Sequence, residues 1–349
     1  MSNHDDAIGK LRSILNLPVS KLKELIPHLE NPEKVEAFSQ ALTSFLEMLN
    51  ISRDKKFTFL LLGRTGVGKS STVNSLMGMD AAPTDPFEPT TMDVHIYEHE
   101  SNNIHFTVID TPGLCDDIEE SENDESYLEL IHSKVEQVDL LWFITPLDET
   151  RVRTDEKRGI RLISEAFGSK LWEHSIIVFT FADKVSESDF LRFLEKRTEL
   201  IRKEIAKNLD DPAIAETIPS IAVTNRSKQT PDGKNWLGEL YTKVFVRMSE
   251  RGAFPFLLAT ANRVKKEPNW RFYDEFNSES NQSENAGYSF SDFIDLNAVQ
   301  RKLIQEKLLT YVPAFAAAGA GIGAMFGPIG AAIGGVTGAG LGFVASIFG

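Results

Sequence analysis

The chain has 349 residues, enough for one α/β domain of about 200 residues with further segments on either side. Its 51 acidic and 37 basic residues give a formal net charge of −14 without any basic stripe, which argues against nucleic acid as a partner. The single cysteine, Cys115, excludes an internal disulfide and fits a reducing compartment, and the acidic first ten residues predict no export signal.

The spacing of apolar residues divides the chain into four parts. Residues 1–50 have helical spacing with prolines as breaks, which predicts an N-terminal helical segment. Over residues 51–250, short apolar runs alternate with charged helical segments, which predicts an α/β fold with a doubly wound, mostly parallel sheet. Residues 251–298, polar from 265 onward, predict a linker, and residues 299–349 an apolar tail. The expected strands are Phe57–Leu62, His95–Tyr97, Ile104–Ile109, Leu140–Ile144, Ile176–Phe179 and Ile221–Val223.

The first expected strand runs into the phosphate-binding pattern G-x-x-x-x-G-K-S. Gly63 allows a sharp exit from the strand, and Gly66 and Gly68 allow backbone N–H groups to point at phosphate oxygens. Lys69 is expected to reach the β- and γ-phosphates and Ser70 to ligate Mg²⁺, with the following helix directing its positive end at the same anion. The predicted loop comprises Gly63, Arg64, Thr65, Gly66, Val67, Gly68, Lys69, Ser70 and Ser71.

Two further segments are expected to sense the γ-phosphate. Asp110-Thr-Pro-Gly113 follows a predicted strand, so Asp110 can hold Mg²⁺ through water and the Gly113 N–H can contact the phosphate. The intervening segment PFEPTTMD offers either Thr90 or Thr91 as a hydroxyl ligand of Mg²⁺, and the sequence does not choose between them.

The base is expected to be guanine. Asp183, in Thr180-Phe-Ala-Asp183, can accept hydrogen bonds from N1–H and the 2-amino group of guanine, which adenine does not offer. Asn225, after the next expected strand, is a second candidate base contact. An ATPase or kinase is the alternative that Asp183 opposes.

Several ordered segments resemble a known group of proteins: GRTGVGKSSTVNSLMG, DTPG, VDLLWFITPLDETRV, TFAD and VTNRS. They are similar to the avirulence-induced, immunity-associated GTPases and to the chloroplast outer-envelope translocon GTPases, both septin-like. The resemblance covers about residues 50–250. It implies GTP or GDP with Mg²⁺ as cofactors, and GTP hydrolysis to GDP and phosphate involving Lys69, Thr90, Thr91 and Gly113. Phe181 departs from the lysine that many GTPases carry two residues before the base-reading aspartate.

The expected hydrolysis rate is low. Leu114 stands where many small GTPases carry a glutamine that orients the attacking water. The translocon GTPases have an arginine in a similar L-D-x-x-R-V segment that reaches across a symmetric dimer, and the resemblance assigns this role to Arg151. It thereby implies a homodimer. Arg153 is an alternative, and a solvent-exposed Arg151 without such a role is another.

Residues 312–349 are uncharged and carry glycines spaced by four on either side of Pro328. On helices such glycines allow close approach, so the segment predicts a helical hairpin that enters a membrane, or a glycine zipper that packs on protein. The chain is thus expected at the cytoplasmic face of a membrane or in the cytoplasm. We expect it to act as a GTPase switch or scaffold whose nucleotide state controls dimerisation or binding to an effector. The sequence does not identify that effector. A preprotein receptor and a septin-like assembly protein with little hydrolysis are the alternatives.

Overall fold

The structure is a computed structural model that describes residues 56–83, 94–102, 104–111, 124–135, 137–265 and 293–311. The chain divides into two units, of which residues 55–263 with 288–300 form one. The expected N-terminal segment and the tail over 312–349 lie outside the described residues.

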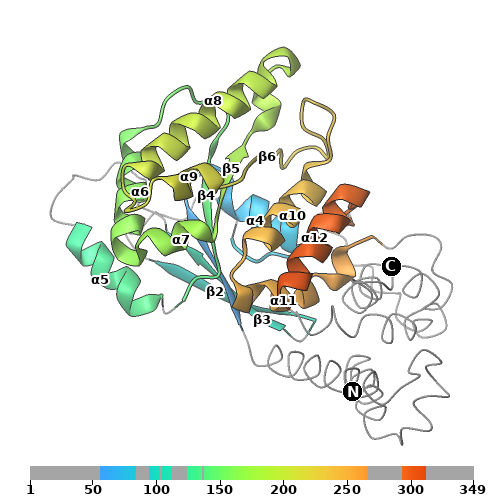
Figure 1. The fold of residues 1–349 in the computed structure, drawn as a ribbon, viewed down its shortest axis with the longest axis horizontal. Coiled ribbons are helices and arrows are strands. Elements are labelled where there is room, and N and C mark those ends of the chain that lie inside the picture. Colours follow the sequence, from blue (N-terminus) through green and yellow to red (C-terminus); the bar gives the residue numbers. More distant parts are fainter. Residues whose placement is uncertain are drawn as a thin grey trace, which may run out of the picture. The chain divides into compact units, whose positions relative to one another are not determined.

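A six-stranded sheet in the order β2-β3-β1-β4-β5-β6 lies at the centre of this unit (Figure 1). Strands β3, β1, β4, β5 and β6 run parallel to one another, and β2 pairs antiparallel with β3. The predicted mostly parallel, doubly wound sheet is therefore confirmed. The strands are β1 (Phe57–Leu62), β2 (His95–Ser101), β3 (Ile104–Asp110), β4 (Leu140–Pro146), β5 (Ser175–Thr180) and β6 (Ser220–Ala222).

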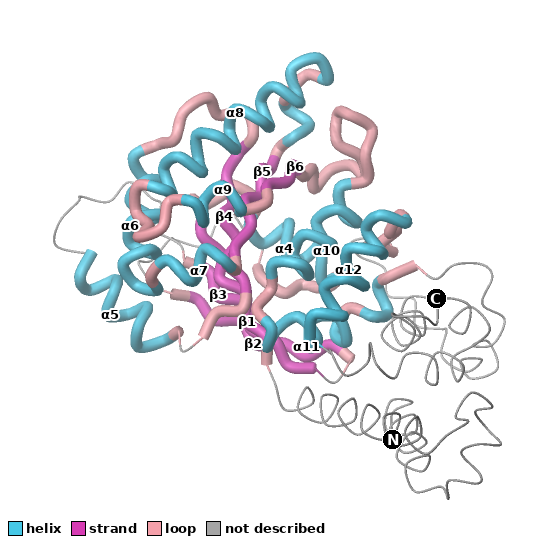
Figure 2. The backbone as a smooth tube through the Cα atoms, viewed as in Figure 1, coloured by secondary structure: helices cyan, strands magenta, loops and turns pink. Residues whose placement is uncertain are grey.

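Helices cover both faces of the sheet (Figure 2). Helices α4 (Lys69–Met77), α10 (Trp236–Arg247) and α11 (Glu250–Ala259) lie on one face. The opposite face carries α5 (Asp124–Lys134), α6 (Thr154–Phe167), α7 (Ser169–Glu173), α8 (Glu187–Ala206) and α9 (Ala213–Thr217). Strands β1, β4 and β5 are buried along their whole length because both faces are covered, which explains their mostly apolar sequences. Two short 3₁₀ helices, η1 (Ala182–Lys184) and η2 (Ala261–Arg263), complete this unit.

Helix α11 corrects the expected start of the linker at residue 251. It packs on β1 and β3, where Phe256 lies edge-on to Phe57 and Phe59, with ring centroids 5.7 and 5.9 Å apart. Phe57 in turn stacks on Phe106 of β3. Such aromatic contacts bury large apolar areas, so residues 250–263 belong to the α/β unit and not to a linker. Pro255 inside the helix conceals it in the sequence, since proline is rare in helix interiors.

Helix α4 is fixed at its carboxyl end. Arg263 donates from Nη2 to the Ser75 carbonyl oxygen at 2.7 Å, which places a cation where the helix dipole is negative. The buried Asn74 side chain exchanges two hydrogen bonds with the backbone of Ala82, at 2.8 and 2.9 Å. These contacts hold the start of the segment that leads toward Thr90 and Thr91.

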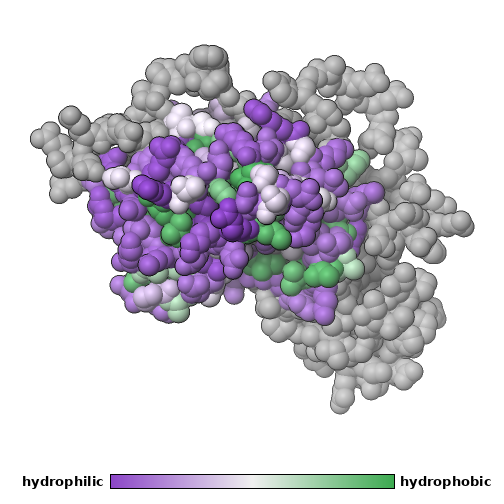
Figure 3. Space-filling model, turned by 90° about the horizontal axis from the view of Figure 1, so that it is seen from above, coloured by the Kyte–Doolittle hydropathy of each residue, from purple (hydrophilic) through white to green (hydrophobic). Residues whose placement is uncertain are grey.

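The face of the molecule seen in Figure 3 is mainly hydrophilic, with hydrophobic residues in small separate groups. The last described helix, α12 (Ala298–Tyr311), begins in the α/β unit and continues into the other unit. No helix in the described part of the chain is long and apolar enough to cross a membrane.

Candidate functional site

The carboxyl ends of five strands meet at one edge of the sheet, where ligands bind in open α/β folds. The phosphate-loop sequence follows β1, and Asp110 ends β3. The Arg151 segment follows β4, and Asp183 and Asn225 follow β5 and β6. The topology therefore brings these candidate residues to a common edge, as their positions after apolar runs suggest.

Two glycines give the loop its shape. A Cβ at Gly63 would overlap the carbonyl oxygen of Ile144 in β4, so only glycine fits between the two strands. Gly68, which caps α4, has φ 93° and ψ 22°, a left-handed conformation that favours glycine. Arg64, Thr65, Gly66 and Val67 lie between these glycines, and Ser70 and Ser71 lie in the first turn of α4.

The Lys69 ammonium contacts oxygens around the loop. It donates to the carbonyl oxygens of Gly63 and Arg64, at 2.8 and 3.1 Å, and its Nζ lies 3.4 Å from Asp110 Oδ1. That carboxylate oxygen is buried and accepts no hydrogen bond from the described residues. Burial raises the pKa of Asp110, and the nearby Lys69 charge opposes the shift. A mostly buried, incompletely bonded carboxylate beside a phosphate loop fits a divalent cation, which prefers oxygen ligands, and Ser70 is the neighbouring hydroxyl.

The segments after β5 and β6 are bonded to the phosphate loop. Thr180 donates its hydroxyl to the Val67 carbonyl oxygen at 2.6 Å, and Thr180 is fully buried. Asn225 donates from Nδ2 to the Thr72 hydroxyl in α4 at 3.1 Å. The hydroxyl of Thr72 donates to the Gly68 carbonyl oxygen at 2.8 Å. The candidate phosphate and base segments therefore form one hydrogen-bonded group.

Asp183 is exposed in the turn after β5. Its Oδ2 lies 3.9 Å from Nη1 of Arg226, which follows Asn225. Phe181, two residues before Asp183, has φ 55°, and the Lys184 ammonium lies 4.0 Å from its ring centroid. An aromatic ring with a cation over it thus stands where many GTPases carry a lysine.

The segment after β4 holds Arg151 at the same edge. The Arg151 side chain is exposed, and it makes no hydrogen bond or ion pair with the residues that the structure describes. Its carbonyl oxygen accepts a hydrogen bond from Nη1 of Arg197 at 2.7 Å. Arg153, the alternative candidate, is instead paired with Glu149, with Nε 2.9 Å from Oε2. Of the two arginines, Arg151 is therefore the one whose guanidinium has no partner in the described part of the chain.

Arg64 connects the phosphate loop to the Arg151 segment. It forms an ion pair with Glu149, and its Nε lies 3.5 Å from Asp155 Oδ2. Sequence patterns gave no sign of this contact, nor of the buried Arg197, because the partners are distant in sequence. Glu156, the third residue of α6, accepts a hydrogen bond at its Oε2 from the Arg153 N–H at 2.9 Å, but the sequence gave no sign of this contact because Arg153 is not a usual N-cap residue.

Three expected site residues, Thr90, Thr91 and Gly113, lie outside the described residues. Leu114, which stands where many small GTPases carry a glutamine, also lies outside the described residues. Their proposed roles remain predictions.

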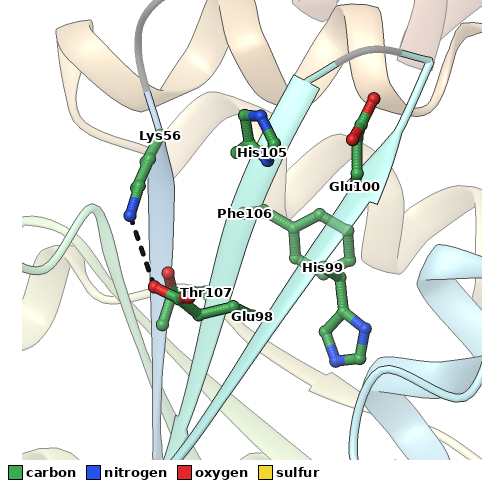
Figure 4. Close-up of a pocket in the computed structure, with 7 residues that line it drawn as sticks. All are labelled: Lys56, Glu98, His99, Glu100, His105, Phe106 and Thr107. Atoms are coloured by element: carbon green, nitrogen blue, oxygen red, sulfur yellow. Dashed lines mark hydrogen bonds and ion pairs between the residues drawn. The ribbon is translucent and has the colours of Figure 1, made fainter.

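A cavity of about 220 Å³ lies elsewhere, on β2 and β3 (Figure 4). Its lining residues are Lys56, Glu98, His99, Glu100, His105, Phe106 and Thr107. Lys56 precedes β1 whereas Gly63 follows it, so this cavity lies at the opposite end of β1 from the phosphate loop. The dashed contact in Figure 4 is the exposed Lys56–Glu98 pair, at 3.3 Å.

Comparisons with known proteins agree with the motifs. The family model described as the AIG1 family matches residues 57–235, just over half of the chain. Translocase of chloroplast 34 from Pisum sativum is 30% identical over 230 residues, which cover 60% of this chain and 73% of the relative. Translocase of chloroplast 33 from Arabidopsis thaliana is 29% identical over 220 residues, which cover 58% and 73%. Translocase of chloroplast 108 from Physcomitrium patens is 26% identical over 257 residues, which cover 67% of this chain and 25% of that longer relative.

Solved structures of similar sequence include Arabidopsis thaliana Toc33 in complex with GDP and Mg²⁺. It is 27% identical, has a TM-score of 0.46, and the match covers 60% of this chain and 90% of that chain. Toc33 in complex with Mg²⁺ and GMPPNP is also 27% identical, with a TM-score of 0.46 and coverage of 65% and 94%. The family match and the translocase relatives confirm the resemblance predicted from the sequence, namely a GTPase domain of the AIG1 and chloroplast translocon group. The chain belongs to the AIG1 family.

Proposed function

We propose that this chain is a slowly hydrolysing GTPase switch whose nucleotide state controls pairing of two copies through Arg151. The observation that carries the proposal is the exposed Arg151 guanidinium, which has no partner among the described residues yet follows β4 at the edge that bears the phosphate loop. An arginine so placed can bind phosphate oxygens through two parallel hydrogen bonds. Translocon GTPases, which this chain resembles, have an arginine at the matching place.

The proposed reaction is transfer of the γ-phosphoryl group of GTP to water. The water oxygen bonds to the γ-phosphorus, the bond to the β–γ bridging oxygen breaks, and GDP, phosphate and a proton result. Lys69 and the loop N–H groups would hold the phosphates, and Ser70, Asp110 and one of Thr90 and Thr91 would hold Mg²⁺. When bound, Mg²⁺ supplies positive charge against the phosphate oxygens. The partner's Arg151 would supply charge that Leu114 cannot.

The decisive experiment replaces Arg151 by alanine. We expect weaker dimerisation with GMPPNP, turnover reduced on the order of tenfold or more, and unchanged GTP affinity, because the guanidinium acts on the partner's nucleotide. Sedimentation velocity and phosphate release, measured at concentrations that populate the wild-type dimer, provide the readouts. Lys157→Ala, which removes an exposed cation from α6, is the matched control. Unaltered sedimentation and turnover in Arg151→Ala would contradict the role.

A preprotein receptor is the second candidate. Relatives of this chain are named translocases of chloroplast, and the net charge of −14 suits a basic targeting peptide. The test is fluorescence anisotropy of a labelled basic peptide with GMPPNP-loaded and GDP-loaded protein, against an acidic peptide of equal length. Equal affinity for both peptides, or for both nucleotide states, would speak against a receptor. An assembly protein with little hydrolysis would instead form large nucleotide-dependent oligomers in the sedimentation experiment.

A further inference from the structure

Arg197 is a buried charge in the middle of α8. Its side chain is only 2% exposed, and its guanidinium contacts the segment between β4 and α6. Nη1 donates to the Arg151 carbonyl oxygen at 2.7 Å, and Nη2 donates to the Thr145 hydroxyl at 2.9 Å. Nη2 also lies 3.4 Å from Glu156 Oε1. Arg197 therefore joins the end of β4, the loop after it and the start of α6.

Glu156 also binds the segment between β4 and α6. Its Oε2 accepts from the Arg153 backbone N–H at 2.9 Å, and its Oε1 accepts from the Thr145 hydroxyl. The carbonyl of Arg151 and the N–H of Arg153 are thus bound by two side chains that also form an ion pair with each other. The backbone that follows the Cα of residue 151 is thus held at two groups, while the Arg151 side chain is exposed.

Stability alone gives a weak reason for this buried pair. Removing two charges from water is costly in free energy, and well-packed apolar residues of similar volume often stabilise a core equally well. Burial accordingly lowers the pKa of Arg197, and the nearby charge of Glu156 opposes that shift. Unlike two apolar side chains, the pair supplies a donor for the Arg151 carbonyl oxygen and an acceptor for the Arg153 N–H.

We propose that Arg197, together with Glu156, is a positioning residue that holds the Arg151 backbone so that the guanidinium is presented to the nucleotide of a second copy. The inference rests on the proposed role of Arg151 in pairing. A side chain that binds a partner's phosphate acts best when its backbone is held in place, since a displacement of about 1 Å can cost on the order of 100-fold in rate. Arg64 joins the segment to the phosphate loop through Glu149, which lies two residues before Arg151.

The test uses the double variant Arg197→Met with Glu156→Gln in the full chain, since a single change would leave one buried charge unpaired. Methionine keeps the volume and glutamine keeps one acceptor. We expect GMPPNP-dependent dimerisation to weaken about tenfold and kcat to fall by a similar factor, with the dissociation constant for GTP unchanged. Hydrogen exchange over residues 147–153 should rise, and exchange over 63–70 should not. Arg192→Met, which changes an exposed arginine of the same helix, is the control.

A purely structural role is separated by combining these changes with Arg151→Ala. If Arg197 acts through Arg151, the double variant produces no further loss of dimerisation or kcat in the Arg151→Ala background. Additive losses, a weaker affinity for GTP, or unchanged exchange over 147–153 would overturn the inference. Failure of the proposed function is distinct from these outcomes: Arg151→Ala alone would then leave dimerisation and turnover unchanged.

Discussion

At the scale of single residues, the Lys69 ammonium contacts two carbonyl oxygens of the phosphate loop and the Asp110 carboxylate. Lys69→Ala should weaken GTP binding about 100-fold or more, because two or more charge-assisted hydrogen bonds to the phosphates are lost. Titration with a fluorescent GDP or GTP analogue measures the change. Lys157→Ala should bind as the wild type does, and an unchanged dissociation constant in Lys69→Ala would remove the loop from the nucleotide site.

Asp183 is the residue on which the choice of base depends. In Asp183→Asn, the amide offers a donor where the carboxylate offers only acceptors, so it complements the 2-carbonyl of xanthine in place of the 2-amino group of guanine. We expect the preference for GTP over XTP to fall by about tenfold or more, as measured by competition with a labelled nucleotide. Asp189→Asn, an exposed aspartate on α8, controls for charge. Unchanged GTP binding in Asp183→Asn would assign base reading to another group.

At the scale of elements, Asp139 joins the start of β1 to α11. It is fully buried and accepts from the Thr58 N–H at 2.8 Å, from the Ser249 hydroxyl at 2.5 Å, and from Nη2 of Arg251 at 2.7 Å. Asp139→Ala leaves these donors without their acceptor, so we expect a loss of about 3–5 kcal/mol in the free energy of unfolding. Urea denaturation with saturating GDP measures the loss. Asp189→Ala, on the protein surface, should change the midpoint little.

The strands were predictable from sequence, whereas the polar ties between elements were not. Runs such as Phe57–Leu62 are almost entirely apolar because both faces of the strand are covered, and that pattern is visible without any contact information. Asp139 and Arg197 look like ordinary surface charges in sequence, since their burial depends on partners brought close only by the fold. The end of the domain was misplaced for a related reason: the helix around Pro255 is identified by its packing on β1 and not by local propensity.

The same distinction holds at the site. Motif spacing predicted that Lys69, Asp110, Asp183 and Asn225 would gather, because each follows a strand of a parallel sheet. It did not predict the tie between Arg64 and Glu149, because neither residue has a fixed role in the motif. A motif therefore predicts which residues contact the ligand. The contacts that hold those residues in place differ from chain to chain and are not part of the motif.

At the scale of the whole molecule, every described candidate site residue lies in the α/β unit, and the expected membrane segment lies in residues 312–349. A chain that ends at Tyr311 keeps α12 whole and should leave the membrane fraction while retaining its GTP affinity, because the tail contains no nucleotide motif. Cell fractionation with salt and carbonate washes, compared with the full chain, measures this. A truncated chain that still resists both washes would contradict the membrane anchor.

The hydrogen bonds from Thr180 to Val67 and from Asn225 to Thr72 have a consequence for how affinity is distributed along the nucleotide. The parts that would hold the sugar-borne base and the parts that would hold the phosphates share one set of bonds, so ordering one orders the other. Guanosine and pyrophosphate, offered as separate fragments, should then favour each other's binding. Their joint occupancy would exceed the product of their separate occupancies. In the intact nucleotide, binding of either the base or the phosphates would order the site for the other part.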